Sequence, residues 1–166
     1  GKSSDELAYF RDEYQFLNVT LVEQPNGDFA HTIVRQFFYD AFAFNYYEIL
    51  EKSAFAPLAA IAEKSLKEVK YHLRHSREWL VRLGDGTEES RERLQQALLV
   101  LWPFTAELFQ MQSEDQLLQQ HGVAPAAASI AEAWRKMVEA AYREATLQLP
   151  ENLPMAAANG RSGRHS

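Results

Sequence analysis

Apolar and small side chains recur along residues 57–83 in alternating steps of three and four, the spacing of one face of an α-helix. This face consists of Ala59, Ala62, Leu66, Val69, Leu73, Ser76, Leu80 and Leu83. A second stripe lies one residue earlier, about 100° around the helix, and contains Ile61, Ser65, Glu68, His72, His75 and Trp79. The pattern predicts one long helix from Pro57 to Leu83, which packs against near-parallel neighbours and ends at Gly84-Asp85-Gly86.

Residues 29–52 also repeat with a helical period, and this stretch is unusually aromatic. One face has the steps four, three, four, three and contains Ile33, Phe37, Asp40, Phe44 and Tyr47, while Phe38, Phe42 and Tyr46 lie on other faces. A helix that is apolar on most sides is buried on most sides. Because a buried carboxylate is costly unless it is paired, we expect Asp40 to form a hydrogen bond with a neighbouring helix. A metal-ligand position is the alternative.

The rest of the chain predicts shorter helices. We expect a short helix at Asp5–Asn18, an N-cap at Asp28, a helix that Thr87 caps and Pro103 kinks, a short helix at Asp115–Gln120 and a last helix from about Ala126 to Leu147. The helix after Thr87 has a seam at Leu94, Leu98, Leu101, Thr105 and Leu108. No segment alternates like a strand. The predicted fold is all-α with antiparallel helices, in one domain over residues 1–148 and an extended tail over 149–166.

Composition narrows the possible partners of the chain. Its 166 residues are 46% hydrophobic, carry a net charge of −6 and include no cysteine. The basic residues are dispersed, which argues against a nucleic-acid partner. No apolar run approaches the roughly 20 residues that span a bilayer, and residues 1–20 are charged throughout, unlike a signal peptide. We therefore expect a cytoplasmic protein with no membrane partner and no thiolate metal site.

Candidate metal chemistry is thin. Di-iron helix bundles use Glu-x-x-His pairs, in which residues three apart project side by side. No Glu of this chain has a His three residues later; Glu68 precedes His72 by four residues, and His75 follows His72 by three. We expect no metal and no other cofactor. The alternative is a degenerate di-metal oxidase with Asp40, Glu68, His72 and His75 as ligands.

Several motifs together resemble one family. They are Leu21–Ile33 with Arg35-Gln36, Lys67-Glu68 with Tyr71–Arg74 and Trp79, Arg82–Thr87, Leu101-Trp102 with Phe104–Phe109, Glu144–Leu147, and Gly160-Arg161 with His165-Ser166. In these motifs the chain resembles the structural (PaaC-type) subunits of bacterial phenylacetyl-CoA epoxidases, over nearly its whole length.

The resemblance implies a ferritin-like bundle in which residues 29–52 and 57–83 are the third and fourth helices. We accordingly expect the chain to be part of a longer polypeptide, with two bundle helices before Gly1. The resemblance also implies a non-catalytic subunit that pairs with a related di-iron subunit, which oxidises phenylacetyl-CoA. Large apolar patches mark interaction sites. We therefore expect another chain, the di-iron subunit or a second copy, to cover Phe37, Phe44, Leu66, Leu73 and Trp79.

Overall fold

The computed structural model describes residues 3, 5–6, 9, 17–150, 154–157 and 159–163. The elements with assigned bounds are α2 (Thr20–Glu23), α3 (Phe29–Leu50), α4 (Ala56–Gly84), α5 (Glu88–Leu101), the 3₁₀ helix η2 (Trp102–Phe109), α6 (Ser113–Gln120), α7 (Ala127–Glu144) and the 3₁₀ helix η3 (Gly160–Ser162). No β-strand occurs in these described ranges. The predicted all-α fold is confirmed. Most of the predicted Asp5–Asn18 helix lies outside the described residues.

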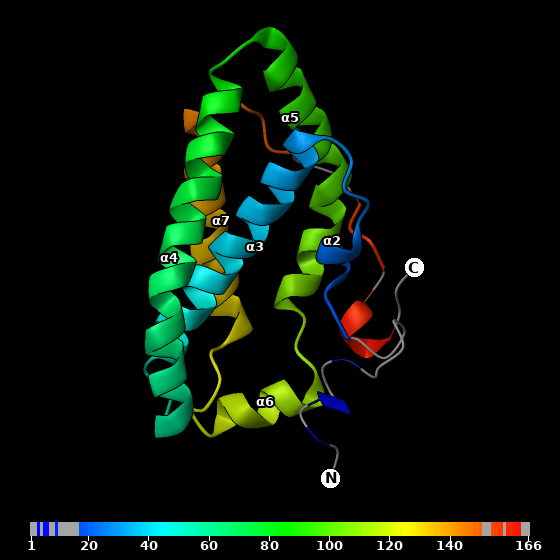
Figure 1. Cartoon of the computed structure of the whole chain (residues 1–166). Helices are drawn as coiled ribbons and strands as arrows, with labels where there is room; N and C mark the ends of the chain where they lie inside the picture. The colour runs from blue at the N-terminus through cyan, green and yellow to red at the C-terminus, as the bar shows by residue number, and fades with distance from the viewer. Residues whose placement is uncertain are drawn as a thin grey trace.

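The two long helices begin where the sequence places caps. The Asp28 carboxylate accepts the backbone N–H of His31 at 3.0 Å and so caps α3. Pro57 occupies the first turn of α4, where its missing N–H costs nothing. The chain turns back between Glu51 and Phe55, so α3 and α4 lie side by side and antiparallel, as predicted (Figure 1).

Helix α3 occupies the centre of the bundle and contacts α4, α5 and α7 (Figure 1). This position explains its aromatic composition, because three neighbours cover it. The Phe38 ring lies 5.8 Å from the Trp102 ring, 5.6 Å from that of Trp134 and 6.0 Å from that of Tyr142. The Trp134 indole also donates a hydrogen bond to the Phe38 carbonyl oxygen at 3.0 Å. These contacts tie η2 and α7 to the middle of α3.

The predicted seam of α4 faces the bundle. Ala62, Leu66, Ser76 and Leu80 are buried. The second stripe mostly faces outward, since Ile61, Glu68, His72 and His75 are exposed and Trp79 is half-buried. At its end, Gly84 approaches α7 so closely that an added Cβ would lie 2.2 Å from the Ala145 carbonyl oxygen. The sequence period therefore identified the buried face of α4 correctly.

The helix after Thr87 changes its type at Pro103. Thr87 and Ser90 form a reciprocal capping box, and α5 then runs to Leu101, where the chain continues as the 3₁₀ helix η2. Proline cannot donate the backbone hydrogen bond that an α-helix needs at this point. The predicted kink is thus a change of helix type, and the predicted seam (Leu94, Leu98, Leu101, Thr105 and Leu108) is buried on both sides of it.

The C-terminal segment contacts the helices. The Ala156 backbone N–H donates to the Pro103 carbonyl oxygen at 2.9 Å, and Gly160 is buried. The Asn159 amide donates to the Gln110 side chain at 2.6 Å. The division into a domain at 1–148 and a tail at 149–166 stays a prediction. None of the helices in the described ranges combines the length and apolarity that crossing a membrane requires.

Candidate functional site

Asp40 is a buried acid between α3 and α4, with 5% of its surface exposed. Its carboxylate accepts the Ser76 hydroxyl at 2.7 Å and the Gln36 amide at 2.7 Å. Burial raises the pKa of Asp40, while these two hydrogen bonds and the nearby His72 and His75 act in the opposite direction. The prediction that Asp40 bonds a neighbouring helix is confirmed, since Ser76 belongs to α4.

The remaining metal candidates point elsewhere. Glu68, His72 and His75 are exposed on α4, and the Tyr71 ring stacks on that of His75 at 6.5 Å. Within the described ranges, no three His, Cys, Asp or Glu side chains gather closely enough to hold a metal ion. A di-iron centre needs several carboxylates and imidazoles around one point. The donor set that these residues present does not fit such a centre.

The predicted interface residues divide into two groups. Phe37 and Leu66 are already buried by this chain's own helices, with the Phe37 ring 6.2 Å from that of Tyr142 on α7. The prediction that another chain covers them is therefore wrong for these two side chains. Phe44, Leu73 and Trp79 are half-buried, and an interface there stays a prediction.

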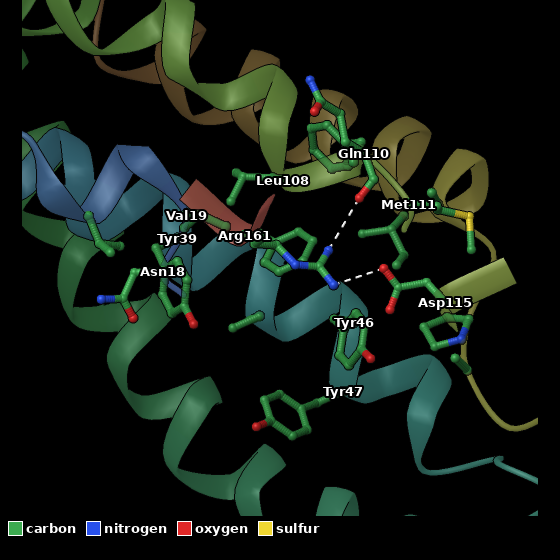
Figure 2. A pocket seen from close by; sticks show the side chains of 18 of the residues that line it. Asn18, Val19, Tyr39, Tyr46, Tyr47, Leu108, Gln110, Met111, Asp115 and Arg161 are labelled. Carbon is green, nitrogen blue, oxygen red and sulfur yellow. Dashed lines mark hydrogen bonds and ion pairs between the residues drawn. The ribbon is translucent and has the colours of Figure 1, made fainter. Parts of the chain in front are cut away.

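A pocket of about 330 Å³ lies on the other side of α3 (Figure 2). It is formed by α3, η2, the start of α7, residues 17–22 and the η3 segment. Its lining includes the aromatic side chains Tyr39, Phe42, Tyr46, Tyr47 and Phe109. Sequence reasoning placed Phe42 and Tyr46 on secondary faces of a buried helix and did not predict a pocket. The phenol groups on those faces were the available signal, because a buried tyrosine usually has its hydroxyl near polar groups.

One end of the pocket is polar. Arg161 donates to the Asp115 carboxylate at 2.8 Å and to the Gln110 carbonyl oxygen at 3.2 Å, as the dashed lines in Figure 2 mark. Burial raises the pKa of the Tyr46 phenol; the Asp115 charge adds to this rise and the Arg161 charge opposes it. Tyr46 therefore lies within electrostatic range of the ion pair.

Glu107, a buried acid of η2 that sequence reasoning missed, fixes the position of Arg161. Only 2% of its surface is exposed. One carboxylate oxygen accepts the Thr20 backbone N–H at 2.7 Å and the Thr20 hydroxyl, and the other accepts the Arg161 backbone N–H at 3.3 Å. One carboxylate thus joins α2, η2 and η3 around the pocket. No local pattern reveals it, because its partners are 87 and 54 residues away.

Comparisons with known proteins agree with the motifs. Residues 1–166 match the family described as phenylacetic acid catabolic protein. The chain is also 46% identical, over 162 residues, to the C-type subunit of the 1,2-phenylacetyl-CoA epoxidase of Escherichia coli (strain K12). That match covers 98% of this chain and 65% of the relative, so the chain spans just under two thirds of the relative's length. The resemblance inferred from the motifs is confirmed: the chain belongs to the phenylacetic acid catabolic protein family.

Proposed function

We propose that this chain is the non-catalytic, structural subunit of a cytoplasmic phenylacetyl-CoA epoxidase, and that it binds and stabilises the di-iron catalytic subunit. The observation that carries the proposal is the 46% identity, over 98% of the chain, to the C-type subunit of such an enzyme. An antiparallel helix bundle suits this role, because it can present long helix faces to a related bundle.

The chemistry of the acidic residues supports a structural role. The Asp40 carboxylate is engaged by Ser76 and Gln36, and Glu107 is engaged by backbone and side-chain donors of Thr20 and Arg161. Both buried acids therefore join helices of this chain. The exposed donors of α4 are not arranged around a common point with Asp40. These observations favour scaffolding over a second oxidation site.

The α3–α4 face is the proposed contact surface. It contains the half-buried Phe44 and Leu73, and the Lys70 ammonium lies 5.9 Å from the centre of the Phe44 ring. Tyr71 and Ile61 add exposed surface on α4, where each has 59% of its area accessible. Exposed apolar groups rimmed by charge are typical of protein interfaces.

Co-elution tests the proposed contact. The chain is mixed with the purified di-iron subunit of a phenylacetyl-CoA epoxidase and analysed by gel filtration. We expect one complex for the native chain and its loss with Phe44→Asp or Leu73→Asp, because a buried unpaired carboxylate is costly at an interface. Leu117→Asp on α6 is the control, since this leucine is 56% exposed and remote in sequence from the proposed face. Circular dichroism verifies that each variant is folded.

Two outcomes of this experiment would contradict the proposed contact. The first is co-elution of all three variants to the same extent as the native chain. The second is a folded native chain that never associates with the catalytic subunit. Association only between copies of this chain, measured by sedimentation, would favour a homo-oligomer on the same face.

Metal analysis and activity test the non-catalytic assignment. We expect no stoichiometric iron or manganese in the purified chain after incubation with either ion. We also expect Glu68→Ala to leave the oxygenase activity of the assembled complex intact. Stoichiometric metal, together with loss of activity in Glu68→Ala, would instead favour the degenerate oxidase with Asp40, His72 and His75.

A further inference from the structure

The pocket of Figure 2 has the size of a small-molecule site. Its volume is about 330 Å³. Ligand pockets begin at roughly 300 Å³, and an apolar cavity of about 150 Å³ holds benzene. The pocket therefore has room for one six-membered ring with a short polar substituent.

The walls favour a ring that is aromatic. The Phe42 ring is the centre of the lining: its centroid lies 5.7 Å from that of Tyr46 and 5.9 Å from that of Phe109, with an interplanar angle of 72° in the second pair. The Tyr39 ring lies 6.3 Å from Phe42 on a further side. Faces and edges of aromatic rings are thus presented together, and a planar ring can make offset and edge contacts with both.

The polar end favours an uncharged substituent. Among the described lining residues, Asp115 and Arg161 are the charged ones, and they form an ion pair whose charges cancel. The guanidinium has five N–H donors, and two hydrogen bonds from it, to Asp115 and Gln110, are described. A carbonyl oxygen can accept one of the others, whereas a carboxylate would also meet the Asp115 charge.

The C-terminal segment closes this end. Glu107 holds the Arg161 backbone, Asp115 holds its side chain, and Asn159 bonds to Gln110. The guanidinium is therefore held in place by residues of η2 and α6. A donor that is fixed before binding loses less conformational entropy when a ligand arrives.

We propose that this pocket binds the neutral arylacetyl group, with the aromatic ring against Phe42 and Phe109 and the carbonyl oxygen toward Arg161. The choice of an arylacetyl group rests on the proposed function, whereas the preference for a neutral, aromatic ligand follows from the pocket alone. The chain thereby holds the acyl part of a substrate or product away from any metal centre.

The three methionines of the chain provide a direct readout. Met111 lines the pocket, Met137 packs on the core and Met155 is 46% exposed outside it. The chain is labelled with ¹³C-methyl methionine and titrated with phenylacetamide, phenylacetate and cyclohexylacetamide. We expect phenylacetamide to shift the Met111 methyl signal saturably and to leave the other two unchanged. We expect the anion and the non-aromatic amide to bind about tenfold more weakly.

Two substitutions test the geometry. Ala43→Leu fills the pocket from α3, while Ala60→Leu makes the same change at an exposed position of α4. We expect the first to weaken phenylacetamide binding by about tenfold or more and the second to have no effect. Asp115→Asn leaves the Arg161 charge uncompensated, so it should reverse the preference from phenylacetamide to phenylacetate. This variant keeps the size of the side chain and remains informative if Ala43→Leu fails to fold.

The proposal is overturned if phenylacetamide causes no saturable shift of Met111, or if binding is equal in Ala43→Leu and the native chain. It is also overturned if Asp115→Asn leaves the order of the ligands unchanged. Ligand binding is measured on the chain by itself, whereas the proposed structural role is measured by co-elution with the catalytic subunit. Failure of one experiment therefore leaves the other result standing.

Discussion

Ser76→Ala removes the hydroxyl that joins α4 to the buried Asp40 on α3. The Ser76 side chain is completely buried, and its hydroxyl lies 2.7 Å from the carboxylate oxygen of Asp40. After the substitution, Gln36 is the remaining hydrogen-bond donor to this carboxylate. A hydrogen bond to a charged group contributes about 1.5–3 kcal/mol. We expect the free energy of unfolding to fall by about this amount at neutral pH.

The loss should depend on pH in a defined direction. Burial raises the pKa of Asp40 in the folded chain above the value of the unfolded chain, and the Ser76 hydrogen bond opposes this rise. Ser76→Ala therefore raises the folded pKa further. A carboxyl with a raised folded pKa contributes most stability below its unfolded pKa, and this contribution is lost as pH rises through the folded pKa. The variant should thus be impaired little near pH 4 and most near pH 7, both approximate values.

Urea unfolding of a double-mutant cycle measures this effect. In the Asp40→Asn background no charge remains, so Ser76→Ala should cost only the value of a neutral hydrogen bond, about 0.5–1.5 kcal/mol, at both pH values. Ser129→Ala on the exposed side of α7 is the control and should change stability by less than about 0.5 kcal/mol. If Ser76→Ala costs the same in both backgrounds and at both pH values, the ionised carboxylate is not what Ser76 stabilises.

Three further substitutions probe the bundle by urea unfolding. Tyr142→Phe should raise the free energy of unfolding by about 1 kcal/mol, because the buried phenol oxygen has no hydrogen-bond partner among the described residues; a decrease would reveal a bound partner. Gly84→Ala should lower it by about 3 kcal/mol, since the new Cβ overlaps Ala145, and an unchanged stability would refute this close packing. Asp28→Ala should cost about 1 kcal/mol and Asp28→Asn much less. Hydrogen bonds to His31 lower the pKa of Asp28 to about 2, so this stability is present above the unfolded pKa, 3.8, and is lost as pH falls through about 2; a penalty unchanged at acid pH would contradict this.

Helix positions and buried faces were predictable because they depend on local geometry. The period of apolar residues identified the buried side of α4, from Ala62 to Leu80, and the cap at Asp28 placed the start of α3. Such features involve residues three or four positions apart, whose relation a helix determines in advance. The same period showed that Phe37 and Leu66 are buried, but it assigned them to another chain, because a repeat shows that a face is covered without showing what covers it.

The sequence by itself determined the all-α fold, the order of the long helices and the membership of a family. The tertiary structure decided how the distant segments meet: the partners of Asp40 and Glu107, the ion pair between Asp115 and Arg161, and the pocket beside Phe42. The physical reason is that a hydrogen bond or ion pair leaves no periodic signal when its two groups come from separate elements. Their meeting depends on how the helices pack.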